Sequence, residues 1–144
     1  MNPNNLRIGH GYDVHRFERA YVEAKPLTLA GVVLADKMSL VAHSDGDVIL
    51  HATCDAILGA LGEGDIGQHF PDTDPKFAGV ASADLVQQVL VMMGARQHYI
   101  VNIDITVIAE VPKLTPHRVN MISSLANLLE LPEQRVNLKA TTTE

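Results

Sequence analysis

Apolar and polar positions follow two different periods along this chain. Alternation with a period of two is typical of strands, and apolar residues spaced by three and four are typical of helices. The first pattern predicts strands at residues 6–15, 98–108 and 136–142, and a hairpin at 27–34 that turns near Ala30 and Gly31. The second pattern predicts helices at residues 45–61, 83–93 and 115–129.

Local signals place the ends of these helices. Ser44 or Asp45 can cap the first helix, because a side-chain oxygen there accepts hydrogen bonds from the free amides of the first turn. Ser82 is expected to cap the second helix, which ends at Gly94. Thr115, followed by a proline, is expected to begin the third.

The order of these elements predicts an α/β fold, an α+β sandwich in which helices pack on one face of a small mixed, ferredoxin-like sheet. The strand at 98–108 is apolar on one face and half apolar on the other, which permits a partner subunit, as in a trimer. The absence of a linker or repeat predicts a single catalytic domain over residues 1–144. Because the chain stops directly after its last strand, we expect a further C-terminal strand to be missing.

Composition excludes several classes of protein. With 47% apolar and 19% charged residues, the chain can form a core. A net charge of -6 opposes nucleic-acid and anionic-membrane partners, although a bound metal can still attract a small anion. No apolar stretch is long enough to span a bilayer, and the polar start at residues 1–5 predicts no secretory signal. The single cysteine, Cys54, indicates core packing and a soluble protein of a reducing compartment, the cytoplasm.

Three side chains form a candidate metal site. Asp13 and His15 lie two apart and so share one face of an extended segment. His51 lies on the first helix, one turn from Asp47 and from Asp55, either of which could accept the second ring N–H. Two histidines and one carboxylate leave a vertex open, which favours a catalytic metal. Spacing alone leaves an alternative: a partly buried His51 bonded to one of these aspartates.

Other polar clusters have two interpretations each. The segment His43-Ser44-Asp45-Gly46-Asp47 can offer helix-terminal amides to a phosphate or hydroxyl, or it can simply cap the helix. The loop at residues 64–74 can bind substrate or only turn the chain. At the C-terminus, Glu144 can hold magnesium, while the threonines before it are also ordinary strand formers. Lys113 can meet a phosphate or remain solvated.

Six segments, taken together, resemble the 2-C-methyl-D-erythritol 2,4-cyclodiphosphate synthase family in order and spacing over nearly all the chain. They are residues 8–15, 42–48 with His51, 64–67, 70–74, 112–113 and 139–144. The resemblance implies an enzyme of non-mevalonate isoprenoid biosynthesis, a lyase. It would convert 4-diphosphocytidyl-2-C-methyl-D-erythritol 2-phosphate into the 2,4-cyclodiphosphate and CMP. It also implies a homotrimer with active sites between subunits.

The resemblance further assigns roles to individual residues. Zinc would be bound by Asp13, His15 and His51, and magnesium or manganese by Glu144 together with the phosphates. His43 and Thr142 would be catalytic. Substrate would contact the following residues: Asp13, Val14, His15, His43, Ser44, Asp65, Ile66, Gly67, Phe70, Pro71, Asp72, Thr73, Asp74, Ala109, Glu110, Val111, Pro112, Lys113, Leu114, Thr115, Thr141, Thr142, Thr143 and Glu144.

The implied chemistry is an intramolecular attack of the 2-phosphate on the β-phosphorus of the diphosphate, with CMP leaving. Metal ions would offset the repulsion between the two anions, and folding the substrate back on itself would supply proximity, worth up to about 7–11 kcal/mol. Two other interpretations fit the same residues. One is a zinc-dependent phosphohydrolase, and the other is a non-catalytic trimer that binds a metal or an isoprenoid.

Overall fold

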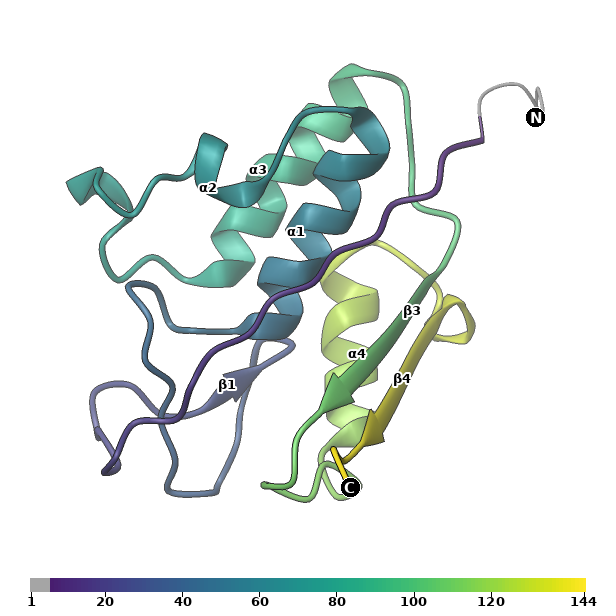
Figure 1. Ribbon diagram of the computed structural model, residues 1–144. Coiled ribbons are helices and arrows are strands. Elements are labelled where there is room, and N and C mark those ends of the chain that lie inside the picture. Colours follow the sequence, from purple (N-terminus) through teal and green to yellow (C-terminus); the bar gives the residue numbers. More distant parts are fainter. Residues whose placement is uncertain (1–5) are drawn as a thin grey trace.

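The computed structural model describes residues 6–144 (Figure 1). The polar start at 1–5, from which we expect no secretory signal, lies outside the described residues. The helices are α1 (Val48–Leu61), α2 (Ile66–His69), α3 (Ser82–Ala95) and α4 (Arg118–Leu128), with short 3-10 turns η2 (Pro75–Phe77) and η3 (Glu133–Arg135). The strands are β1 (Thr28–Leu29), β2 (Val32–Val33), β3 (Ile103–Ile108) and β4 (Val136–Thr141). Within residues 6–144 no helix combines the length and apolarity needed to cross a membrane.

The strands form two separate small sheets, so the mixed α/β class is confirmed and the prediction of one mixed sheet is wrong for this chain. β1 and β2 form an antiparallel hairpin, while β3 and β4 pair in parallel from Ile103 with Val136 to Ile108 with Thr141. α4 packs against β4 and covers one face of the parallel pair (Figure 1). On β3 the predicted alternation is confirmed, because burial changes at every residue between the covered face and the exposed face.

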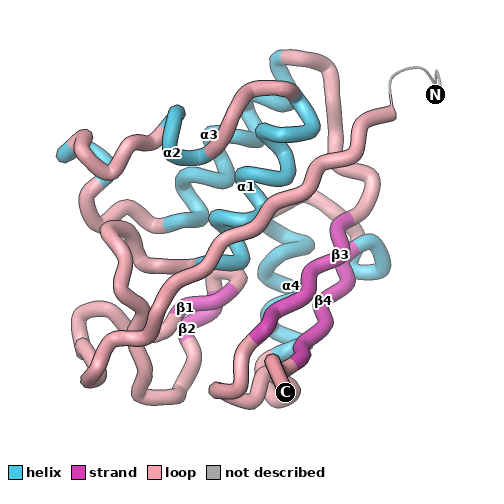
Figure 2. The backbone as a smooth tube through the Cα atoms, in the orientation of Figure 1, coloured by secondary structure: helices cyan, strands magenta, loops and turns pink. Residues whose placement is uncertain are grey.

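Residues 6–15 do not form a strand, which corrects our prediction. The segment is extended but unpaired, and it crosses the molecule along α1 (Figures 1 and 2). A Cβ atom added at Gly9 or at Gly11 would lie 1.7 Å from a backbone carbonyl oxygen of α1, that of Ala56 or Ala52 respectively. The two glycines therefore allow the segment to lie directly on the helix, where any side chain would collide.

The hairpin at 27–34 is confirmed, and it is anchored to α1. Ala30 and Gly31 both have positive φ, 56° and 74°, as a tight two-residue turn requires. The carboxylate of Asp47 accepts both of their amides, at 3.0 and 2.7 Å, and also those of Ile49 and Leu50 in the first turn of α1. Asp47, and not Ser44 or Asp45, is therefore the cap of this helix. Complete burial raises the pKa of Asp47 to about 6, although the amides oppose that shift.

The other helix ends also differ from those predicted. Ser82 is the first residue of α3 and not its cap, and α3 continues one residue past Gly94 to Ala95. α4 begins at Arg118, three residues after Thr115. Local capping signals thus locate each helix to within a few residues, but packing decides which residue starts it.

Candidate metal centre and active-site cavity

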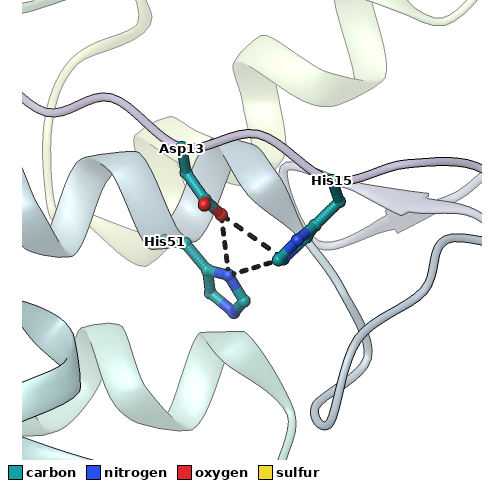
Figure 3. A group of neighbouring side chains, drawn as sticks. All are labelled: Asp13, His15 and His51. Atoms are coloured by element: carbon teal, nitrogen blue, oxygen red, sulfur yellow. Dashed lines mark hydrogen bonds and ion pairs between the residues drawn. The ribbon is translucent and has the colours of Figure 1, made fainter.

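Asp13, His15 and His51 converge on one point, as predicted (Figure 3). Burial alternates along the extended segment, so Asp13 and His15 face α1 together while Tyr12 and Val14 point outward. The Oδ2 atom of Asp13 lies 3.0 Å from Nδ1 of His51 and 3.4 Å from Nε2 of His15. The two ring nitrogens lie 3.3 Å apart.

These separations suit a tetrahedral ion. Ligand atoms at about 2.0–2.1 Å from a tetrahedral zinc lie about 3.3–3.4 Å from one another. The three atoms in this chain lie 3.0 to 3.4 Å apart, so a shared ion fits between them with little movement. Two imidazoles and one carboxylate are also ligands that zinc accepts, and three protein ligands leave a vertex open.

The electrostatics of Asp13 favour its ligand form. Burial by itself raises the pKa of this carboxyl. The side-chain contact with His51, the nearby imidazole charges and the amide of Val14 together outweigh burial, so the net effect is a lowered pKa. Asp13 is therefore held as a carboxylate that faces both rings.

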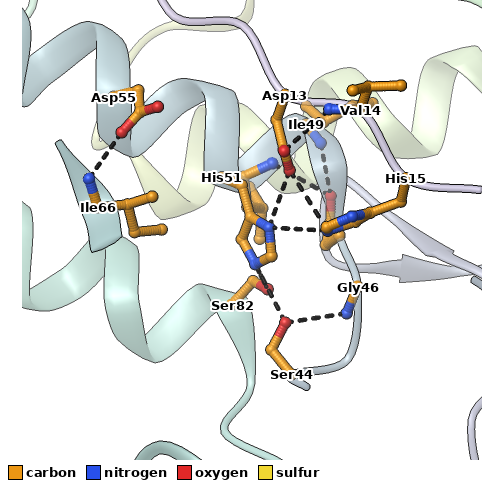
Figure 4. A network of polar contacts seen from close by, with 12 residues as sticks. Asp13, Val14, His15, Ser44, Gly46, Ile49, His51, Asp55, Ile66 and Ser82 are labelled. Atoms are coloured by element: carbon orange, nitrogen blue, oxygen red, sulfur yellow. Dashed lines mark hydrogen bonds and ion pairs between the residues drawn. The ribbon is translucent and has the colours of Figure 1, made fainter. Parts of the chain in front are cut away.

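The second nitrogen of His51 does not meet either predicted aspartate. Its Nε2 lies 2.9 Å from Oγ of Ser82 and 3.1 Å from Oγ of Ser44 (Figure 4). The carboxylate of Asp47 instead accepts the four backbone amides described above, and that of Asp55 accepts the amide of Ile66 at 2.7 Å. Helical spacing places Asp47 and Asp55 one turn from His51, but neither bonds to its ring. The prediction of an aspartate partner for this ring is therefore wrong.

The three ligands open into a cavity of about 760 Å³. Its other walls come from the loop before α1, from the loop around α2 and from the start of α3. Of the residues predicted to contact substrate, it is lined by Asp13, His15, His43, Ser44, Ile66, Gly67, Phe70, Pro71, Asp72 and Thr73. Phe70 is buried and packs edge-on against Phe77, with the ring centroids 5.3 Å apart, so this wall of the cavity is apolar and well packed.

Polar contacts hold the two loops that shape the cavity. Nδ1 of His43 lies 3.4 Å from Oδ2 of Asp72, and both side chains are largely exposed. The amide of Ile66 donates a hydrogen bond to Asp55 on α1, which fixes the start of α2 and was not predicted from the sequence. Asp65 caps α2 by accepting the amide of Gln68, and Asp74 caps the turn at 75–77, so neither carboxylate lines the cavity in this chain.

The remaining predicted residues gather elsewhere. Residues 109–115 and 141–144 lie together beyond the carboxyl ends of β3 and β4, where the amide of Ala109 bonds to the carbonyl of Thr141. The hydroxyl of Thr143 donates to Glu110 at 3.3 Å. None of these residues lines the cavity of the same chain, and Glu144 does not join the Asp13, His15 and His51 cluster.

The sequence did not predict that Asp45 and Ser82 take part in holding the ring of His51. Asp45 and Ser82 lie 37 residues apart, and the packing of α1 against α3 brings Ser82 to the ring of His51 and Asp45 to Ser82. Cys54 is fully buried, and burial raises its pKa to about 12, which agrees with a packing role.

Comparison with known proteins extends over nearly the whole chain. The profile of the YgbB family matches residues 6–144. The chain is 51% identical, over 97% of its length and 86% of the relative's, to a 2-C-methyl-D-erythritol 2,4-cyclodiphosphate synthase of Francisella tularensis subsp. novicida. A solved structure of a synthase of this name matches with a TM-score of 0.87 and 42% identity, covering 95% of this chain and 89% of that one. A CDP-bound form matches with a TM-score of 0.87 and 39% identity, over the same shares.

Proposed function

This chain belongs to the YgbB family, and from that premise we propose how its own residues perform the reaction of its 2-C-methyl-D-erythritol 2,4-cyclodiphosphate synthase relatives. The chain is an enzyme, a lyase that acts on phosphorus–oxygen bonds in isoprenoid biosynthesis. Its substrate is linked to a cytidine diphosphate, and the products are the 2,4-cyclodiphosphate and CMP. The CDP-bound relative supports this class of substrate.

One observation carries the proposal: three ligand atoms 3.0 to 3.4 Å apart stand at the wall of a cavity of about 760 Å³. Asp13, His15 and His51 would hold zinc, which the donor set and the spacing fit. When bound, such a cation neutralises phosphate charge and polarises the phosphoryl group. A second ion, magnesium or manganese, would be held by the phosphates and Glu144.

The residues of the cavity wall would bind and orient the substrate. His43 and Ser44 would position the substrate, and the loop from Asp65 to Gly67 would meet the erythritol hydroxyls. The nucleophile is already a phosphate anion, so no side chain has to remove a proton from it. The work of the wall is to fold the substrate so that its 2-phosphate lies in line with the bond to CMP, and to exclude water.

The cytidine side of the site would come from a neighbouring copy in a homotrimer. Residues 109–115 and 141–144 lie together and are largely exposed, yet they are absent from the cavity of their own chain. A neighbour's copy of this cluster would bring Lys113 to the phosphates and Thr142 to the diphosphate. The ferredoxin-like description, the catalytic domain limits and the cytoplasmic location remain predictions from the sequence.

The test uses the full chain with zinc, magnesium and the substrate. We expect CMP release by chromatography, together with a cyclic diphosphate signal in phosphorus NMR. Asp13→Asn should lose both zinc and CMP release, whereas Glu133→Gln, an exposed carboxylate in η3, should keep them. Full CMP release from zinc-free protein would refute the role given to Asp13.

The same assay in oxygen-18 water separates the phosphohydrolase alternative. Hydrolysis introduces one labelled oxygen into a product, while cyclisation introduces none, because the nucleophile belongs to the substrate. A non-catalytic metal- or isoprenoid-binding protein would bind zinc through His51 and release no CMP.

A further inference from the structure

The two nitrogens of the His51 ring have different surroundings (Figure 4). Nδ1 faces Asp13 and His15, and Nε2 faces the hydroxyls of Ser82 and Ser44. A neutral histidine that offers Nδ1 to a metal carries its proton on Nε2. The groups around Nε2 therefore decide whether Nδ1 is available as a ligand.

Ser82 lies between His51 and the carboxylate of Asp45. Its side chain is completely buried, with its hydroxyl 2.9 Å from Nε2 of His51 and in hydrogen-bond contact with Oδ1 of Asp45. Its amide donates to Oδ2 of the same carboxylate at 3.0 Å. Because a carboxylate only accepts, the hydroxyl proton points to Asp45, and a lone pair of the oxygen is left facing Nε2.

We propose that Asp45 and Ser82 act as a positioning pair for His51, which keeps the ring proton on Nε2 and directs the lone pair of Nδ1 to the metal. The inference rests on the metal site of the proposed function, and it adds to that site two residues that touch neither metal nor substrate. It assigns to Ser82 and Asp45 the part that Asp47 and Asp55 were predicted to play. Carboxylates and carbonyls commonly fix metal-bound histidines in this way, and here a buried hydroxyl stands between carboxylate and ring.

The pair also fixes the tilt of the ring from two helices. Ser82 is the first residue of α3, and Ala81 before it provides no side-chain cap, so Asp45 serves that helix end. Asp45 further accepts the amide of Asp47, the cap of α1, at 3.2 Å. The carboxylate of Asp45 thus bonds to the starts of both α1 and α3, and the Ser82 hydroxyl that it orients contacts the ring of His51.

The experiment measures zinc affinity of the full chain by competition with a chelator. Ser82→Ala removes the nearer of the two hydroxyl oxygens beside Nε2, the one that Asp45 orients, and we expect zinc to bind about 10–100-fold more weakly. Ser82→Thr keeps a hydroxyl and should recover most of the affinity. Asp45→Asn keeps the shape but turns an NH₂ group toward either the amide or the hydroxyl of Ser82, so zinc should also bind more weakly.

Ser39→Ala is the matched control. Ser39 is also a buried serine, 2% exposed, whose hydroxyl bonds to the backbone of Val22 and lies outside the cavity. Its loss should leave zinc affinity unchanged. Melting of each metal-free variant reports whether it is folded.

The tautomer gives a readout that needs no variant. Nitrogen–proton correlation NMR of the zinc-loaded wild-type protein should show His51 with its proton on Nε2 and its Nδ1 bound to metal. A proton on Nδ1, or unchanged zinc affinity in both Ser82→Ala and Asp45→Asn, would overturn the positioning role. If His51→Ala bound zinc as tightly as wild type, the metal site itself would be wrong, which is a distinguishable result.

Discussion

The two regions that carry the predicted chemistry differ in how they are held. Around α1, Asp13, His15 and His51 are partly buried and tied to one another and to buried hydroxyls. Beyond β3 and β4, residues 109–115 and 141–144 are mostly exposed, and backbone pairing with few side-chain contacts holds them. The first region is preorganised within one chain, while the second presents its side chains outward. This difference is what we expect if each site joins the first region of one subunit to the second region of another.

The strongest way to break the preorganised region is to lift the extended segment off α1. In Gly11→Ala, the added Cβ would lie 1.7 Å from the carbonyl oxygen of Ala52, so the backbone carrying Asp13 and His15 must move. We expect zinc affinity and CMP release each to fall by about 100-fold or more, and stability to fall by about 1–3 kcal/mol. Chelator competition, the CMP assay and denaturant unfolding measure these changes.

Gly94→Ala provides the control for that substitution. A Cβ at Gly94, within α3, meets nothing within 4 Å, and alanine favours a helix by up to about 1 kcal/mol. Zinc affinity should stay at the wild-type value. If Gly11→Ala also kept it, close contact with α1 would not be what places the ligands.

Mixing two variants tests whether each active site joins the first region of one subunit to the second region of another. Asp13→Asn disables the first region and Glu144→Gln the second, so each protein alone should be nearly inactive. When the two are unfolded, mixed equally and refolded, about a quarter of the sites in a cyclic trimer would join two intact regions. CMP release should then recover to about a quarter of the wild-type rate.

Mass measurement of the mixed oligomers confirms that subunits exchanged. Exchange without any recovered activity would mean that both regions serve the same chain. Wild-type subunits refolded with Glu144→Gln subunits give the reference for dilution of intact sites.

The smallest expected effect concerns Cys54, on the buried side of α1. Cys54 ionises near its ordinary pKa of 9.0 in the unfolded chain, whereas burial, helped by the charges of Asp55 and Asp47, raises its pKa to about 12 in the folded protein. The thiol therefore stabilises the fold fully below pH 9, and this contribution is lost as the pH rises toward 12. Relative to Cys54→Ala, the wild-type protein should lose about 1.4 kcal/mol of unfolding free energy by pH 10. If the difference in unfolding free energy between the two proteins stayed constant with pH, the thiol would have the same pKa in the folded and unfolded states, which contradicts the prediction.

Much of the metal site could be predicted from the sequence. The two-residue spacing of Asp13 and His15 places both on one side of any extended segment, whether or not it pairs in a sheet. The helix that carries His51 was also predictable, since its apolar spacing and its terminal Gly62 are strong local signals. Residue roles beyond these three ligands depended on the family resemblance.

The wrong predictions share one physical cause. Residues 6–15 alternate like a strand, but within residues 6–144 no strand pairs with them, and α1 takes the place of a sheet partner. Asp47 lies at the right spacing for His51, yet the four unpaired amides nearby bind its carboxylate first. In each case a competing partner had the better geometry: α1 for the extended segment, and the amides of residues 30–31 and 49–50 for Asp47.

By itself, the sequence determined the secondary-structure periods, the three ligand types and their order along the chain. Only the tertiary structure decided that Gly9 and Gly11 allow the first segment to lie directly on α1, and that Ser82 reaches His51 from α3 while Asp45 bonds to Ser82. The reason is that periodicity and capping act within a few neighbouring residues, whereas the direction of a ring nitrogen depends on which helices pack together. That packing is a property of the whole core, and no single segment encodes it.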